Sequence, residues 1–120
     1  TVHLSPGEYA KNWKQIEAIG AKRMPDKTYF PAFNCFMNVN EDSRRGWEGV
    51  RDHLEDFHGP PIQDDVVDRW AIAGPPEQIA ERLNEYIDAG VRIFQIVIGS
   101  PDQFDQMRQI AEGVLPLIKR

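Results

Sequence analysis

Hydrophobic and polar positions follow two different periods along this 120-residue chain. A spacing of three or four residues indicates amphipathic helices, whereas a two-residue period or an unbroken apolar run indicates strands. The clearest example lies in residues 71–99, where a helical stretch stands between two glycines and an apolar run follows. We expect Gly74 to cap this helix, Pro75 to be its first residue, and Gly90 to end it in the left-handed conformation. Residues 91–98 are then predicted to form a strand buried on both faces of a parallel sheet.

Three further stretches carry the helical period, each behind a capping residue. The first runs from the cap Ser5, with Glu8 completing a capping box, to about Ala21. The second opens at residues 40–43, and the third opens at the expected cap Ser100. The predicted buried positions of the last two helices are Trp47, Val50, Leu54, Phe57, Phe104, Met107, Ile110, Ala111 and Val114.

Residues 29–39 alternate with a period of two and are predicted to form a strand. The odd positions are nearly all apolar, whereas the even positions mix aromatic side chains with the amides of Asn34 and Asn38. We therefore expect helices to cover the odd face, and we expect the even face to line a cavity with polar groups.

The order of elements is helix, strand, helix, connection, helix, strand, helix, which favours one α/β domain of parallel βα units over residues 1–120. Residues 62–73 show no clear period and are predicted to be an irregular connection, although Val66, Val67 and Trp70 could form a short helical turn before an extended stretch at 71–73. Two strands are too few for a stable sheet. Either residues 71–73 add a third strand, or strands from outside this chain complete the sheet.

The charge balance argues against nucleic acid and membrane surfaces as partners. The chain has 14 basic and 19 acidic residues, a net charge of −5, and its basic residues are scattered along the sequence. Cys35 is the single cysteine, so an internal disulfide is impossible and a reducing, cytoplasmic location is expected. No apolar run approaches the ~20 residues of a membrane span.

Few residues suggest a reaction on their own. His53 and His58 are five positions apart and lie on different faces of a helix, so surface histidines are favoured over a metal site. Cys35 is interpreted as a packing residue. The helix starts at Gly74 and Ser100 could hold an anion, but capping explains both residues equally well.

The ends of the predicted strands are the best positions for a site, because ligands of parallel α/β proteins gather at the carboxyl ends of strands. Asn38 and Asn40 follow the first strand, Gly99 and Ser100 follow the last, and Asn34 lies deeper on the face of Asn38. We expect Asn38, Gly99 and Ser100 to contact a cofactor, and we assign no catalytic or metal-binding residue.

Twelve residues carry a resemblance to the C-terminal signature of the bacterial luciferase-like family. They are Gly74, Pro76, Glu77, Arg82, Leu83, Ala89, Gly90, Val91, Phe94, Val114, Leu115 and Pro116. The chain departs from the family pattern at Pro75, where threonine is usual. Residues 5–9 resemble the helix after the sixth strand of the family, and residues 29–42 resemble the seventh strand and the start of its helix.

The resemblance implies the C-terminal portion of a (β/α)₈ barrel, which would be incomplete as a single chain because a full barrel needs ~250 residues. It implies a flavin-dependent oxidoreductase or monooxygenase that uses FMN or the deazaflavin F420 in the complete protein, with the alternative that this chain binds no cofactor. Asn34, Phe36 and Asn38 would face the barrel interior. Most substrate and cofactor contacts would lie upstream, so we expect the segment alone to be inactive.

A partial barrel would expose a strand edge, which favours pairing between copies. We therefore expect a homo-oligomer, together with a small-molecule substrate for the complete protein. The alternative is a non-catalytic α/β oligomerisation or interaction module derived from the barrel. An independent small doubly wound domain is disfavoured because the sequence predicts too few strands.

Overall fold

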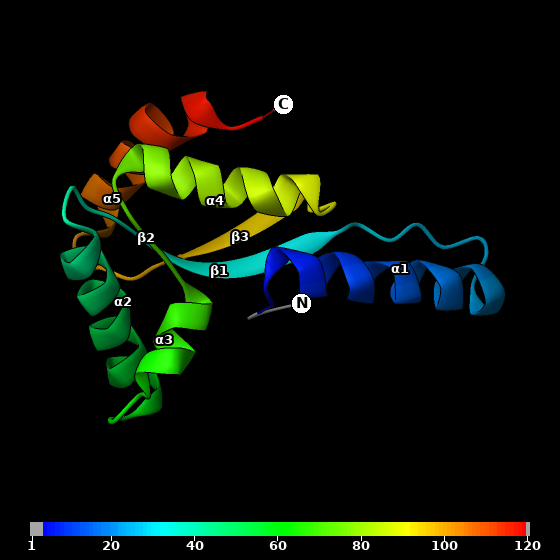
Figure 1. Cartoon of the computed structure of the whole chain (residues 1–120), viewed down its shortest axis with the longest axis horizontal. Coiled ribbons are helices and arrows are strands. Elements are labelled where there is room, and N and C mark those ends of the chain that lie inside the picture. The colour runs from blue at the N-terminus through cyan, green and yellow to red at the C-terminus, as the bar shows by residue number, and fades with distance from the viewer. Residues whose placement is uncertain (1–3, 120) are drawn as a thin grey trace.

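Three parallel strands form the centre of the computed structural model, which describes residues 4–119 (Figure 1). The elements in chain order are α1 (Pro6–Arg23), β1 (Ala32–Val39), α2 (Ser43–His58), α3 (Asp64–Trp70), β2 (Ala71–Gly74), α4 (Pro76–Asp88), β3 (Ile93–Ile98), α5 (Gln103–Gln109), a π-helical turn η1 (Ile110–Val114) and a 3₁₀ turn η2 (Leu115–Leu117). No helix among these residues is long and apolar enough to cross a membrane.

The strand order is β2-β1-β3, with β1 in the middle. On one side, β3 pairs in parallel with residues 32–37, as expected if β1 and β3 are consecutive strands of a barrel. On the other side, β2 pairs with residues 36–39. The sheet therefore gains its third strand from within the chain, which was one of the two possibilities that the sequence left open.

Helices pack on both faces of the sheet. The larger core lies between the odd face of β1 and the helices α1, α4 and η1, and includes Phe33, Cys35, Met37, Val39, Tyr9, Ile79, Leu83, Tyr86, Ile110 and Val114. The smaller core joins Val50, Leu54 and Val67 of α2 and α3 to Phe36 on the even face. The two-residue period of β1 is thus confirmed, but α2 and α3 cover part of the face that was expected to line a cavity.

Several local predictions are confirmed. Ser5 and Glu8 form the capping box, with the Glu8 amide donating to Ser5 Oγ over 3.3 Å and the Ser5 amide donating to Glu8 Oε2 over 2.8 Å. Gly90 follows the end of α4 with a φ of 110°, in the left-handed region that glycine adopts without strain. Cys35 is buried in the larger core.

The predicted helix starts at Gly74 and Ser100 are wrong. Gly74 is the last residue of β2, and Pro75 is the N-cap of α4. Asp102 caps α5, and its carboxylate accepts from the Asp105 amide over 3.1 Å. In both places tertiary pairing or a better capping side chain overrides the local signal. The stretch 62–73 is also not irregular, because it forms α3 and β2, in agreement with the alternative of a helical turn followed by an extended stretch.

Strand β3 is not buried on both faces, and it starts later than predicted. Ile93 remains 47% exposed because β3 is an edge strand and the smaller core covers only the β1 and β2 side of the sheet. Three predicted core residues, Phe57, Phe104 and Met107, are also exposed.

The second half of α1 extends beyond the sheet (Figure 1). Tyr9 is buried and Trp13 packs against the larger core, but Ile16 and Ile19 on the same stripe are exposed. The radius of gyration is 15.4 Å, whereas a compact chain of this length has about 14 Å. The predicted amphipathic stripe of this helix is therefore covered only in its first half.

Candidate functional site

Two of the residues predicted at the strand ends contact each other. Asn38, near the end of β1, is buried, and its Nδ2 donates to the carbonyl oxygen of Gly99 over 2.7 Å. Gly99 follows β3, and its own amide donates to the Met37 carbonyl over 2.8 Å. The carboxyl ends of β1 and β3 are therefore tied by one side-chain and one backbone hydrogen bond.

The other predicted residues lie around this contact. Ser100 is half-buried, and its Oγ accepts from the Asp102 amide over 3.3 Å in the turn before α5. The Oδ1 of Asn40 accepts from the Asp42 amide over 3.0 Å, so this side chain belongs to the start of α2. Asn34 lies further down β1 and pairs in register with Gln95.

Gln106, which the sequence pattern did not single out, is buried at the same end of the sheet. Its Oε1 accepts from the Val39 amide over 2.7 Å, and its Nε2 donates to the Val39 carbonyl over 2.8 Å. The side chain thus continues the strand ladder beyond the last residue of β3. Its signal in the sequence is a spacing of four from the buried Ile110, on a stripe that otherwise holds apolar residues.

Helix α2 crosses directly over this end of the sheet because glycines allow a close approach. A Cβ added to Gly49 would lie 2.5 Å from Asn38 Nδ2, and one added to Gly46 would lie 3.2 Å from the Asn38 carbonyl oxygen. A Cβ on Gly99 would lie 2.9 Å from the Val50 Cα. The amide of Asn38 is thus covered by α2, and its Oδ1 is a buried oxygen without a hydrogen-bond partner in the structure.

A cavity of about 340 Å³ opens beside the covered amide. Its lining consists of Gly49, Asp52, His53, Asp56, Ser100, Pro101 and Gln103. Asp52 and Asp56 make this cavity acidic, which disfavours a phosphate group. His53 lies beside Phe36, at 6.2 Å between ring centroids, whereas His58 packs against Trp70. Within residues 4–119 no three His, Cys, Asp or Glu side chains are placed to hold a metal ion.

Burial changes the chemistry of three titratable groups. It raises the pKa of the Cys35 thiol to about 12, so the thiol stays neutral and unreactive near pH 7. It also raises the pKa values of Tyr9 and Tyr86. Their hydroxyls donate to backbone carbonyls, Tyr9 to Ala32 over 3.2 Å and Tyr86 to Leu4 over 2.7 Å. These groups act in packing, as expected for Cys35.

No family model matches this sequence. Curated proteins with a significant match include the 5,10-methylenetetrahydromethanopterin reductase of Archaeoglobus fulgidus, which is 34% identical over 83 residues. They also include the F420-dependent glucose-6-phosphate dehydrogenase of Kribbella flavida, which is 32% identical over 79 residues. The resemblance to the luciferase-like family is confirmed. The two matches cover 67% and 66% of this chain but only 22% of each relative.

In the comparison with solved structures, nearly all of this chain likewise matches only part of a longer chain. An F420-dependent secondary alcohol dehydrogenase superposes with a TM-score of 0.74 at 18% identity, over 100% of this chain and 42% of that one. The F420-dependent tetrahydromethanopterin reductase of Methanopyrus kandleri gives 0.68 at 19% identity, over 96% and 43%. This chain therefore has the fold of a partial (β/α)₈ barrel.

Proposed function

We propose that this chain is the C-terminal part of a deazaflavin-dependent oxidoreductase. The observation that supports the proposal is the agreement among similar proteins, since three of the four described above carry F420 in their names. FMN and monooxygenase chemistry, which the family resemblance also allows, have no counterpart in those names. In such an enzyme the bound deazaflavin supplies hydride transfer, and the protein supplies binding and orientation.

The strand-end residues of this chain do not fit a bound cofactor ring as they now lie. The Nδ2 of Asn38 is occupied by the Gly99 carbonyl, and Gly49 of α2 covers the same amide. Beyond Ser100, the open cavity presents the carboxylates of Asp52 and Asp56. A cofactor role for Asn38, Gly99 and Ser100 therefore stays a prediction, and we derive no reaction step from them.

The contribution of the chain to the proposed enzyme is structural. It supplies the adjacent parallel strands β1 and β3 with the helices that cover their odd face. It spans 22% of each curated relative, so most of the cofactor and substrate contacts would come from the remaining length. We therefore expect the 120-residue chain to be inactive by itself.

A cofactor titration tests the proposal. The full-length encoded protein and the 120-residue chain would each be titrated with F420 and with FMN, and binding would be followed by the fluorescence of each cofactor. We expect the full-length protein to bind F420 more tightly than FMN and the 120-residue chain to bind neither. A full-length protein that binds no deazaflavin would contradict the proposal.

The alternative function, a non-catalytic interaction module, is favoured by β2. This strand gives the chain a three-stranded sheet with a core on each face, so the chain holds hydrophobic cores of its own. Cooperative thermal unfolding of the 120-residue chain, together with no cofactor binding by the full-length protein, would support the module. Unfolded or insoluble 120-residue chain would exclude it.

A further inference from the structure

The paired strands β1 and β3 carry two amide side chains next to each other on the even face of the sheet. Asn34 of β1 lies in register with Gln95 of β3, and Asn34 is half-buried whereas Gln95 is exposed. The register pairs on either side hold apolar residues, namely Ala32 with Ile93 and Phe36 with Val97. Asn34 and Gln95, called the amide pair below, therefore stand between apolar neighbours on both strands.

The amide pair has unused hydrogen-bonding capacity. Among residues 4–119, neither of the two side chains takes part in a hydrogen bond. Each primary amide offers two N–H donors and a carbonyl oxygen. Because neighbouring strands lie about 4.8 Å apart, the two amides can reach each other, but one bond between them would leave most of these groups free.

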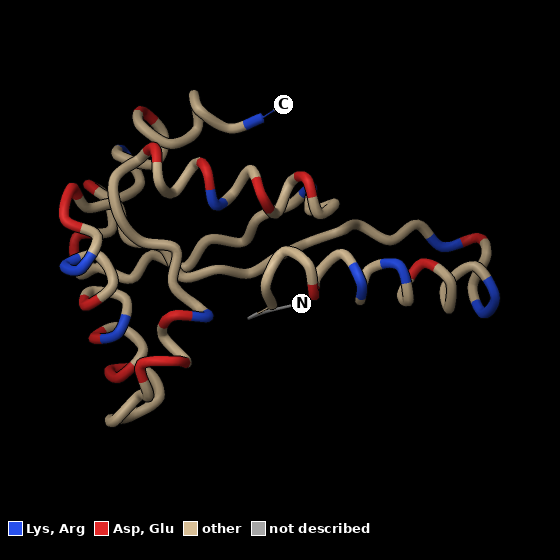
Figure 2. Tube along the Cα trace, in the orientation of Figure 1, with Lys and Arg blue, Asp and Glu red and all other residues tan. Residues whose placement is uncertain are grey.

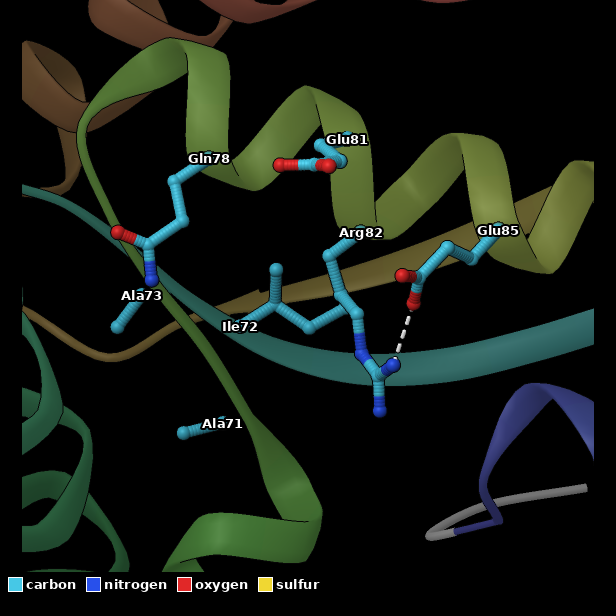
Figure 3. A pocket seen from close by; sticks show the side chains of 7 residues that line it. All are labelled: Ala71, Ile72, Ala73, Gln78, Glu81, Arg82 and Glu85. Atoms are coloured by element: carbon cyan, nitrogen blue, oxygen red, sulfur yellow. Dashed lines mark hydrogen bonds and ion pairs between the residues drawn. The ribbon is translucent and has the colours of Figure 1, made fainter.

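The two strands offer the amide pair no charged neighbour. The Lys, Arg, Asp and Glu residues of the chain lie outside β1 and β3 (Figure 2). The hollow between β2 and α4 is different, because there Arg82 and Glu85 form an ion pair with each other (Figure 3). Both of those charged groups thus have a partner among the described residues, which the amide pair does not.

The even face of β1 and β3 becomes an interior surface when the barrel is complete. Helices α1 and α4 pack on the odd face, and the helices of a (β/α)₈ barrel form its outer ring. This chain supplies only part of such a barrel. Strands from the remaining length would therefore close around Asn34 and Gln95 and remove both side chains from water.

Burial of the two amides is unfavourable unless they gain partners. An amide that leaves water without a new hydrogen bond loses free energy of solvation, and buried polar side chains in proteins are nearly always hydrogen-bonded. A neutral partner fits better than an ion, since β1 and β3 hold no charged side chain to balance one. Hydroxyl and amide groups can both donate and accept, which matches the capacity of the amide pair.

We infer that the amide pair binds neutral hydroxyl or amide side chains that project inward from the barrel strands outside this chain. The interior of the complete barrel then holds a hydrogen-bonded polar group at the level of Asn34, with apolar residues on either side of it. The amide pair is thus a specific contact between this segment and the rest of the protein. The inference rests on the proposed function only in that the full-length protein completes the barrel, and it does not depend on the cofactor.

Thermal unfolding of the full-length encoded protein tests this contact. Asn34→Leu and Gln95→Leu each leave the partner side chains unpaired, so each should lower the midpoint of unfolding by at least about 3 °C. The double variant should lower it by less than the sum of the two, because both amides share the same partners. The matched control Gln103→Leu replaces an exposed amide at the start of α5 and should shift the midpoint by less than about 1 °C.

Smaller substitutions at the same position separate polar surroundings from apolar ones without added bulk. Asn34→Ser and Asn34→Ala differ by one hydroxyl group, so polar partners should make the serine variant the more stable of the two by at least about 2 °C. Asn34→Asp places a charge there and should lower the midpoint more than either, since a buried carboxylate without a cation is unfavourable. These variants keep the test decisive where a leucine at this position prevents folding.

Three results would overturn the inference. One is a raised midpoint for either leucine variant, which would show that the amide pair faces apolar side chains or open water. Another is an Asn34→Ala protein at least as stable as Asn34→Ser. The third is a stabilising Asn34→Asp, which would indicate a cationic partner in place of a neutral one. Cofactor binding enters none of these measurements, so a failed F420 titration would leave their outcome standing.

Discussion

The carboxyl end of the sheet and the second half of α1 (residues 15–23, called the arm below) differ sharply in how the chain supports them. At the sheet end, α2 lies against β1 through Gly46 and Gly49, and the amides of Asn38 and Gln106 bind backbone groups of neighbouring elements. The arm is a single helix with its apolar stripe exposed. Both regions contain a capped, amphipathic helix, so the local helix signals do not explain the difference between them.

The difference lies in what stands opposite each helix. A helix with an apolar stripe is stable in a protein mainly through the surface that it buries. α2 packs on the even face of the sheet. The second half of α1 contacts Tyr29 through Gly20, but its apolar residues Ile16 and Ile19 stay exposed. The comparison predicts that equal changes in the two regions have very different effects.

The largest contrast comes from shortening one aliphatic side chain in each region. Leu54 of α2 is fully buried, so Leu54→Ala should lower the free energy of unfolding by about 3 kcal/mol. The matched change Ile19→Ala in the arm should lower it by less than about 0.5 kcal/mol. Urea unfolding at high salt measures both variants. Similar losses for the two would show that the arm packs as tightly as the sheet end.

A smaller loss of stability is expected when the hydrogen bonds between Gln106 and Val39 of β1 are removed. Gln106→Leu replaces the amide side chain by an apolar one of similar size. The change leaves the amide and carbonyl of Val39 without their side-chain partner. Unpaired buried backbone groups should lower the free energy of unfolding by about 2 kcal/mol. Gln103→Leu is the control, since Gln103 is exposed at the start of α5. Equal effects of the two changes would remove the special role of Gln106.

Local signals in the sequence predicted most elements of the fold. The capping box at Ser5, the left-handed Gly90 and the alternation of β1 each depend on a few neighbouring residues, and all three are confirmed. The sequence does not decide whether residues 71–73 form a strand, because a four-residue strand such as β2 has too short a pattern to be distinguished from a loop. It is a strand because β1 offers an edge, which is a property of the folded sheet.

The candidate site was predictable in position more than in detail. The rule on strand ends located Asn38 and Gly99, which the structure joins by a hydrogen bond. It could not indicate that α2 would cover them, because the approach depends on Gly49 lying over Asn38.

The pH dependence of stability tests the burial of β1 separately from α2. The pKa of Cys35 rises from 9.0 to about 12, so between these values the unfolded chain releases a proton that the folded chain keeps. The contribution is fully present below pH 9 and is lost as the pH rises, at up to about 1.4 kcal/mol per pH unit. From pH 9 to 10.5, the wild type should lose about 1 to 2 kcal/mol more than Cys35→Ala. Equal slopes for the two proteins would mean that the thiol is accessible.

The smallest effects come from a pair of glycine substitutions, and here the two helices should differ in sign. Alanine is the better helix former by up to about 1 kcal/mol. Gly7 in α1 has no atom within 4 Å of an added Cβ, so Gly7→Ala should stabilise the chain by about 0.5 kcal/mol. In Gly49→Ala the new methyl group meets Asn38 Nδ2 at 2.5 Å, and that amide is held by the Gly99 carbonyl. The crowding should outweigh the helix preference and destabilise the chain by about 1 kcal/mol. Thermal unfolding of both variants decides the matter, because a stabilising Gly49→Ala would show that α2 does not lie on the end of β1.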